Sequence, residues 1–301
     1  MRMYIFNPFN LVFLSIENQK IKLMRLLFTI LLLGVMAFST TTNAQNNDEN
    51  QEKETTWNLF KSDANLIFGG VKNAYTKPLH WKKDDWLTVG AVAASASLLY
   101  IYDEQTSEFF INQESKAPQM LKEIGWYYGS PQNFFMISAG IYGYGLFAKN
   151  EKFRHTGVLI ISSAVATGFI QTISKNAFGR ARPSQNVGSR KYKFMSKESG
   201  YHSFPSGHSI LSFTASHAIA KQFDNLWVKG GIYAVGLIAP VSRLWVGAHW
   251  LTDVTLGMVL SVVIVDGVDN FLTSKRNTVK EKSISWNFKA GYKTVGLVGT
   301  F

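Results

Sequence analysis

Three short clusters carry the side chains that could do chemistry in this sequence. In the first, six residues separate Lys175 from Arg182; the second is the run Pro205–His208; the third holds Arg243, His249 and Asp253. Arginine and lysine bind the oxygens of a phosphoryl group, and arginine can bind two of them at once. Together the clusters indicate a site for phosphoryl transfer.

The second cluster lies where a polar segment gives way to an apolar run beginning at Ile210. We expect Pro205 to open a buried helix, with Ser203 or Ser206 as its cap. The N–H groups of Ser206 and Gly207, with the Ser206 hydroxyl, would then cradle an anion at the positive end of the helix. His208 could donate a proton to that anion.

The third cluster places His249 and Asp253 four residues apart, on one face of a predicted helix. The carboxylate can hold one ring nitrogen and leave the other free to attack phosphorus. This pattern predicts a nucleophilic histidine.

The three clusters resemble, without a substitution, the tripartite signature of the type 2 phosphatidic acid phosphatase (PAP2) superfamily. That superfamily includes lipid phosphate phosphatases, bacterial class A acid phosphatases and vanadium haloperoxidases, and the resemblance covers roughly residues 86–272. It implies that His249 forms a phosphohistidine, that Asp253 orients it, and that His208 protonates the leaving group and later activates water. It also implies phosphate binding by Lys175, Arg182, Ser206, Gly207 and Arg243. We expect no metal and no cofactor.

For several other residues the sequence allows either a functional role or a purely structural or incidental one. Arg180 is either a second phosphate contact or a surface charge, and His202 either touches substrate or is incidental. Trp245 and Trp250 either line a route for acyl chains or pack in the core. We expect structural roles for His155 and His217, which also lie outside the clusters.

The elements that must position these residues are predicted from apolar blocks rich in Ala, Gly and Ser, which let helices approach closely. No strand alternation or βαβ rhythm occurs between them. We therefore expect an all-α, six-helix bundle of the PAP2 type, embedded in a membrane. The six blocks are Trp86–Tyr102, Phe134–Ala148, Thr156–Ile173, Ile210–Ala220, Leu226–Ile238 and Trp250–Val265. They are short for membrane spans, so a soluble bundle is the alternative.

The flanking segments are expected to differ from this domain. Residues 1–44 read as a signal peptide cleaved after Ala44, or as an uncleaved anchor. Residues 45–85 read as a polar linker and an amphipathic helix containing Phe60, Ala64, Ile67 and Val71, followed by the phosphatase domain at 86–274. Residues 275–301 read as a basic linker and a short β-hairpin packed on the bundle.

Composition narrows the class of protein. The chain contains no cysteine, which excludes disulfides and thiolate chemistry, and its net charge is +11. Because the basic residues are scattered, they fit an anionic substrate or a membrane surface, and we expect no nucleic-acid partner. Protein partners are not indicated. A hydrophobic content of 46%, gathered in blocks, favours contact with a membrane.

Loop charges predict an orientation. The loops after the second, fourth and sixth blocks are basic, so the loops after the first, third and fifth should lie outside the cytoplasm. The clusters fall in the loops after the third and fifth blocks. This places the protein in the inner membrane of a bacterial envelope, with its site facing the periplasm; a soluble periplasmic or outer-membrane-associated location is the alternative. A cleaved signal peptide conflicts with this orientation, because it puts residue 45 outside and turns the first block the wrong way.

The sequence therefore predicts a phosphatase acting on a phosphomonoester or diphosphate, most simply of a lipid. Candidate substrates by resemblance are phosphatidic acid, phosphatidylglycerophosphate, undecaprenyl diphosphate and lipid A phosphates. The alternatives are a soluble periplasmic acid phosphatase, a vanadium-dependent haloperoxidase and, least favoured, a binding protein that retains a phosphate pocket.

Overall fold

The structure of the 301-residue chain is a computed structural model that describes residues 55–282, 285–291 and 294–300, with side chains up to residue 277. Glu54–Phe301 form one compact unit. The expected signal peptide or anchor at residues 1–44, and nearly all of the expected polar linker, lie outside the described residues.

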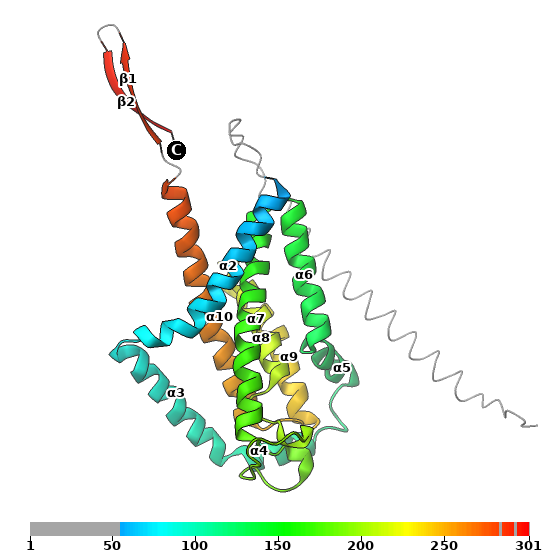
Figure 1. Cartoon of the computed structure of the whole chain (residues 1–301). Coiled ribbons are helices and arrows are strands. Elements are labelled where there is room, and N and C mark those ends of the chain that lie inside the picture. Colours follow the sequence, from blue (N-terminus) through cyan, green and yellow to red (C-terminus); the bar gives the residue numbers. More distant parts are fainter. Residues whose placement is uncertain (1–54, 283–284, 292–293, 301) are drawn as a thin grey trace, which may run out of the picture. The chain divides into compact units, whose positions relative to one another are not determined.

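Within the described residues the chain forms nine α-helices and three short 3₁₀ helices (Figure 1). The α-helices are α2 (Thr56–Thr76), α3 (Lys83–Ile101), α4 (Asp103–Ile111), α5 (Gln119–Tyr128), α6 (Pro131–Phe147), α7 (Glu151–Phe178), α8 (Gly207–Ala220), α9 (Leu226–Trp245) and α10 (Leu251–Lys282). The 3₁₀ helices are η1 (Lys77–His80), η2 (Pro183–Gln185) and η3 (Ser199–Tyr201).

The predicted all-helical domain is confirmed, but the count of six helices is wrong. Each apolar block corresponds to one helix, namely α3, α6, α7, α8, α9 and α10. The bundle also contains α2, α4 and α5. The helices α4 and α5 are short and mix polar with apolar residues. Apolar blocks do not reveal such helices, because only one side of each is apolar.

The hydrophobic core lies around α7. Its residues Val158, Leu159 and Ile160 are completely buried and pack with side chains from α6, α8 and α10. Burying one such side chain contributes roughly 1.5–3 kcal/mol relative to leaving it in water. Figure 1 shows α7 at the front of the bundle, with α6 on one side and α10 on the other.

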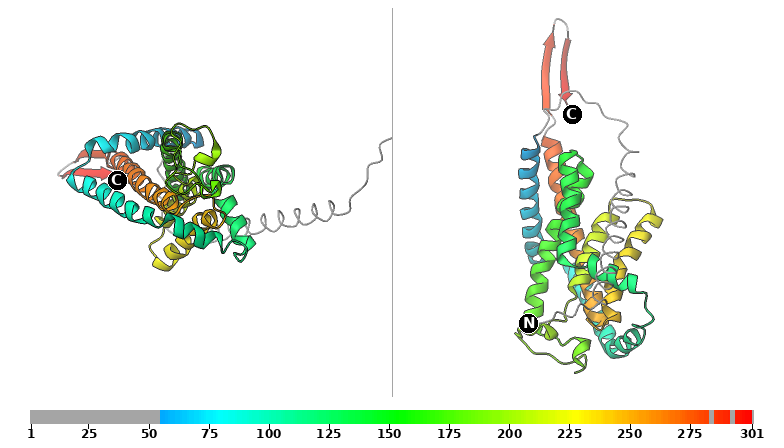
Figure 2. Two further views of the ribbon diagram at one scale, coloured as in Figure 1. Left: turned by 90° about the horizontal axis from the view of Figure 1, so that it is seen from below. Right: turned by 90° about the vertical axis from the view of Figure 1, so that its right-hand side faces the viewer.

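The amphipathic helix α2 packs on α7 and α10, as expected from its pattern (Figure 2). Its buried positions include Leu59 and Asp63, whereas Phe60 is 42% exposed, so the buried stripe differs from the predicted one. Asp63 is fully buried and accepts two hydrogen bonds from Arg154 of α7, at 2.8 and 2.7 Å. A buried carboxylate with a bidentate arginine partner anchors α2 at the start of α7.

Two helices are long and apolar enough to cross a membrane, Glu151–Phe178 and Leu251–Asn277. The bent pair α3 and α4, with 57° between the two helices, is a third candidate in the described chain. The helix α3 is also unusual because none of its residues is buried, although it is mostly apolar. Trp86, Leu87 and Leu98 are each more than half exposed.

The segment after the bundle core differs in part from the expected basic linker and β-hairpin. The helix α10 runs to Lys282, so the segment read as a basic linker from residue 275 is helical up to that point. Beyond it, β1 (Ser285–Gly291) pairs antiparallel with β2 (Thr294–Thr300), from Ser285 opposite Thr300 to Gly291 opposite Thr294.

Candidate active site

The three clusters meet at one end of the bundle. The ends of α7 and α9 and the starts of α8 and α10 are tied together there by hydrogen bonds between segments far apart in sequence. Ser206 N donates to the Asp253 carbonyl at 3.1 Å, and the Trp250 indole N–H donates to the Ala181 carbonyl at 2.7 Å. The side chains of the clusters therefore share one site.

Gly179 directs the first cluster into this site. It ends α7 in the left-handed conformation, with φ 58°, and its N–H donates to the Lys175 carbonyl. A Cβ on Gly179 would lie 1.7 Å from the Lys193 carbonyl oxygen, so only glycine fits this turn. The chain then passes into the interior, where Ala181 is fully buried and Arg182 N donates to the Gly200 carbonyl.

Three cations from two clusters surround the site. Lys175 lies in the last turn of α7, Arg243 in the last turn of α9, and Arg182 just before η2. Burial lowers the pKa of Arg243 to about 10, and the charge of Arg182 acts in the same direction. The Nε of Arg182 is buried with no hydrogen-bond partner in the described residues. Such donors are poised to bind an anion.

His249 is held in one tautomer. Its Nδ1 lies 2.7 Å from the Ser203 carbonyl oxygen, which can only accept a hydrogen bond, so Nδ1 carries the proton. Nε2 consequently carries the lone pair. Burial lowers the pKa of His249 to about 4, against the opposing effect of Asp253, so the ring is neutral at pH 7. The side chain is thus in the state that a nucleophile requires.

Asp253 supports His249 less directly than the spacing suggested. Its Oδ2 is 3.8 Å from His249 Nδ1, an ion-pair distance, while the hydrogen bond of that nitrogen goes to Ser203. The Asp253 carboxylate instead accepts hydrogen bonds from the Ser203 hydroxyl at 2.5 Å, Trp250 N at 2.9 Å and Arg180 Nη1 at 2.7 Å. The carboxylate therefore acts through its charge and through Ser203.

His208 lies in the first turn of α8 and faces Trp126 of α5, with the ring centroids 5.0 Å apart. Its Nε2 is buried and has no hydrogen-bond partner in the described part of the chain. Burial lowers the pKa of His208 to about 3, helped by the positive charges of Arg243, Lys175 and Arg182. The three clusters therefore lie within electrostatic reach of one another.

The start of α8 differs in detail from the predicted anion cradle. The helix begins at Gly207 with Ser206 as its N-cap, so Pro205 precedes the cap instead of opening the helix. Ser206 N is already bonded to the Asp253 carbonyl, and the Ser206 hydroxyl accepts from Ser209 at 2.9 Å. Only the hydroxyl proton of Ser206, with the N–H groups of the first helical turn, remains for an anion.

The structure shows the contacts of Arg180, Trp250 and His202, for each of which the sequence allowed two roles. Arg180 is neither a phosphate contact nor a surface charge: it is 3% exposed and pairs with Asp103 and Asp253. Trp250 is buried and packs against Arg180. His202 bonds the Ser196 carbonyl at 2.7 Å. The histidines expected to be structural pair with carboxylates on α10, His155 with Asp269 and His217 with Asp266.

Sequence reasoning missed Trp126 and Asp103, and it considered Ser203 only as a helix cap. The indole of Trp126 contacts both His208 and the guanidinium of Arg243, whose Cζ is 4.8 Å from the ring centroid. Asp103 and Ser203 bind the groups around His249. For Asp103, the only indication in the sequence was its position directly after the first apolar block. Nothing in the sequence showed that Asp103 is buried. Among the described residues, no group of three or more His, Cys, Asp or Glu could hold a metal ion.

This chain resembles known phosphatases in sequence. Residues 156–270 match the model of the PAP2 superfamily, a range that contains all three clusters. The lipid A 1-phosphatase of Rhizobium etli is 27% identical over 197 residues, which cover 60% of this chain and 80% of that protein. The undecaprenyl-diphosphatase of Sulfolobus acidocaldarius is 30% identical over 111 residues, which cover 36% of this chain and 52% of that protein.

A solved structure, the crystal structure of Aquifex aeolicus LpxE, overlaps 54% of this chain and 92% of its own with a TM-score of 0.39 and 18% identity. Because that score is low, the assignment rests on the sequence matches. The matched range contains the residues gathered at the site, so residues 156–270 are similar to the PAP2 superfamily.

Proposed function

We propose that this protein is a phosphatase that hydrolyses a phosphomonoester or diphosphate of a lipid through a phosphohistidine on His249. The family and the relatives named as lipid A 1-phosphatase and undecaprenyl-diphosphatase support this activity. The observation that carries the mechanism is the tautomer of His249, whose Nε2 lone pair is left free beside the charges of Lys175 and Arg182.

In the first step the Nε2 lone pair attacks phosphorus, and the bond from phosphorus to the leaving oxygen breaks. Protonated His208 gives its proton to that oxygen. Lys175, Arg182 and Arg243 hold the remaining phosphoryl oxygens, with the Ser206 hydroxyl and the Gly207 N–H. These donors stabilise the charge that spreads over the oxygens in the transition state.

In the second step a water molecule attacks the phosphohistidine. His208, now neutral, takes a proton from this water, and the P–N bond breaks with its electron pair returning to Nε2. Inorganic phosphate leaves, and both histidines return to their starting states. Asp253 and the Ser203 carbonyl stabilise the positive charge on the ring of His249 while phosphorus is bound to it.

His208 needs the substrate in order to act as an acid. In the empty site its pKa of about 3 keeps it neutral at pH 7. A phosphate group with up to two negative charges would offset the cations that depress this pKa. Substrate binding therefore raises the pKa of His208 towards the range in which it can donate a proton.

The exposed apolar surface supports a lipid substrate at a membrane. The helix α3 is apolar and has no buried residue, and α7 and α10 are long enough to span a bilayer. A helix that is apolar on all sides and exposed suits lipid surroundings better than water. We place the protein in the inner membrane, with the site on the periplasmic face as the loop charges predict.

The first prediction concerns His249. Replacing it in His249→Ala should abolish phosphate release, because the substitution removes the nitrogen that attacks phosphorus. The measurement is inorganic phosphate released from lipid A, undecaprenyl diphosphate and phosphatidic acid by membrane and soluble fractions. His80→Ala, on an exposed histidine of η1, is the matched control and should keep full activity.

Near-normal hydrolysis by His249→Ala would rule out the nucleophile. Phosphate release only from water-soluble esters, by enzyme recovered without detergent, would replace the lipid phosphatase with a soluble acid phosphatase. Halide oxidation by peroxide after vanadate is added, without phosphate release, would replace it with a haloperoxidase.

A further inference from the structure

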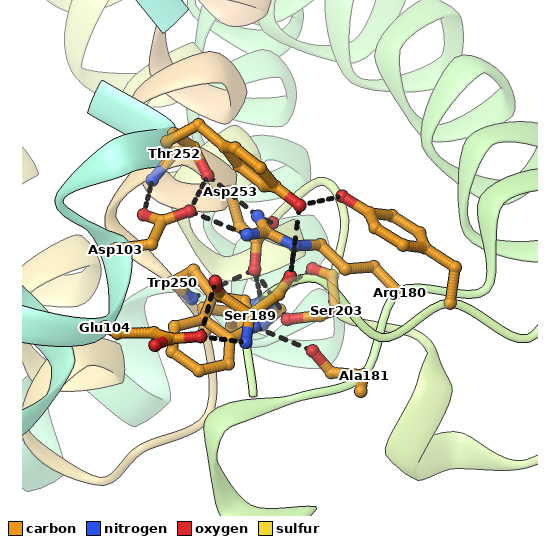
Figure 3. Close-up of polar contacts among 12 residues, drawn as sticks. Asp103, Glu104, Arg180, Ala181, Ser189, Ser203, Trp250, Thr252 and Asp253 are labelled. Atoms are coloured by element: carbon orange, nitrogen blue, oxygen red, sulfur yellow. Dashed lines mark hydrogen bonds and ion pairs between the residues drawn. The ribbon is translucent and has the colours of Figure 1, made fainter. Parts of the chain in front are cut away.

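A buried polar network lies behind the site and is built on Arg180 and Asp103 (Figure 3). Arg180 Nη2 donates to Asp103 Oδ2 at 2.6 Å, and Nη1 donates to Asp253 Oδ1 at 2.7 Å. Its Nε donates to the Ser189 carbonyl at 3.2 Å. One guanidinium therefore joins a carboxylate at the start of α4 to the carboxylate that serves His249.

Each charge in this network is buried and paired. Asp103 and Asp253 are fully buried, and Arg180 lies between the rings of Tyr100 and Trp250. The pKa of Arg180 is raised, because the attraction of Asp253 and Asp103 outweighs the opposing effect of burial. Taking away one member of such a set leaves an uncompensated buried charge.

Asp103 also holds the start of α10. Its Oδ1 accepts from Thr252 N at 2.9 Å, and its Oδ2 accepts from the Thr252 hydroxyl at 2.5 Å. Thr252 is the residue before Asp253, so Asp103 fixes the backbone that carries that carboxylate. It does so at a helix N-terminus, where negative charge is favoured.

The network reaches His249 through Ser203, which is held at three atoms. Ser203 N donates to the Arg180 carbonyl at 3.1 Å, its hydroxyl donates to Asp253, and its carbonyl accepts from His249 Nδ1. Arg180 thus holds Ser203 in two ways: its main-chain carbonyl accepts a hydrogen bond from Ser203 N, and its side chain binds Asp253, which in turn binds the Ser203 hydroxyl. The hydrogen bonds described for the side chains of Arg180 and Asp103 all go to other groups of the protein.

We infer that Asp103 and Arg180 are positioning residues for phosphoryl transfer, which hold Ser203 and Asp253 so that His249 keeps its proton on Nδ1 and its lone pair on Nε2. This inference rests on the proposed function. It assigns the pair to the chemical step and not to phosphate binding, which Lys175, Arg182 and Arg243 perform.

The second prediction tests this assignment with Asp103→Asn, which keeps the shape of the side chain and removes its charge. We expect kcat to fall about 10- to 100-fold, the range seen when the group behind a metal-bound histidine is lost. The KM and the Ki of inorganic phosphate as a competitive inhibitor should change by less than about twofold, because the phosphate-binding cations are untouched. Asp103→Glu should recover part of the loss.

Asp63→Asn is the matched control, since Asp63 is an equally buried carboxylate paired with an arginine far from the site. It should lower the melting temperature but leave kcat of the folded protein unchanged. Equal losses of kcat in Asp63→Asn and Asp103→Asn would overturn the inference. So would a kcat for Asp103→Asn within twofold of the parent, or a rise in Ki that matches the fall in kcat.

A readout independent of turnover separates this inference from the proposed function. Nitrogen NMR of histidine-labelled protein in detergent should show His249 as a single Nδ1–H tautomer, with the His249→Ala spectrum giving the assignment. In Asp103→Asn we expect a mixture of tautomers. If the parent protein releases no phosphate but this mixture appears, the proposed function fails and the positioning role stands; an unchanged tautomer in Asp103→Asn overturns the positioning role.

Discussion

In the proposed mechanism, His208 has to change its protonation state between the empty site and the substrate complex. Burial and the surrounding cations keep it neutral when no anion is present, and Arg243 makes the largest electrostatic contribution to the lowered pKa. The same cations that bind phosphate therefore suppress the acid until phosphate arrives. This arrangement couples substrate binding to proton donation.

The third prediction belongs to this residue. Arg243→Gln removes a positive neighbour, which favours the protonated form of His208 and raises its pKa. The alkaline limb of the kcat–pH profile, where His208 loses the proton it must donate, should therefore move to higher pH, while KM rises. Lys229→Gln, on the same helix but at its other end, should leave the limb in place. A shift to lower pH, or none, would contradict the assignment of His208 as the acid.

At the scale of elements, α5 closes one side of the site. It packs on α8 and α9, and Gly129 directly after it lies so close to His208 that an added Cβ would be 2.7 Å from the His208 Cβ. This approach brings Trp126 against both His208 and Arg243 while leaving it 52% exposed. The helix thus positions an acid and a phosphate-binding arginine together.

The fourth prediction tests that role. Trp126→Ala removes a cation–π contact that contributes roughly 0.5–2 kcal/mol, so the Ki for inorganic phosphate should rise about 2- to 30-fold. Trp126→Phe should keep part of the effect. The control is Trp227→Ala. Trp227 is 90% exposed and lies at the start of α9, whereas Arg243 lies in the last turn of the same helix, so this variant should bind phosphate normally. Normal phosphate binding by Trp126→Ala would show that α5 only covers the site.

At the scale of the whole bundle, the start of α2 and the site lie at opposite ends of α7. Asp63 of α2 pairs with Arg154, at the beginning of α7, whereas Lys175 lies in its last turn. A helix of 28 residues is about 42 Å long, enough to span a bilayer. If the site faces the periplasm, the start of α2 faces the cytoplasm.

The fifth prediction uses the absence of cysteine from the sequence, which gives a clean background for labelling. Lys191→Cys lies in the exposed segment beside the site, and Asp224→Cys lies in the exposed turn between α8 and α9 at the other end. A membrane-impermeant maleimide should label Lys191→Cys in cells whose outer membrane is opened, and Asp224→Cys only after the inner membrane is broken. The reverse pattern would place the site in the cytoplasm.

The sequence by itself predicted the candidate reacting groups and the long helices. Phosphoryl transfer needs particular donors at particular local spacings, and such spacings are visible along the chain. The clusters around Lys175, His208 and His249 can therefore be recognised from residue types and spacing alone. The same holds for the apolar blocks, whose composition reports burial or lipid contact directly.

Only the tertiary structure showed which residues hold the candidate site residues in place. The pairing of Asp103 with Arg180 spans 77 positions and that of Ser203 with Asp253 spans 50, and no local pattern marks either pair. The short helices α4 and α5 were not predicted for the same reason. They are stabilised by packing against the bundle, and their own sequences carry no distinctive pattern. Whether a charge such as Arg180 binds substrate or supports a neighbour depends on what is buried beside it, and burial is a property of the folded chain.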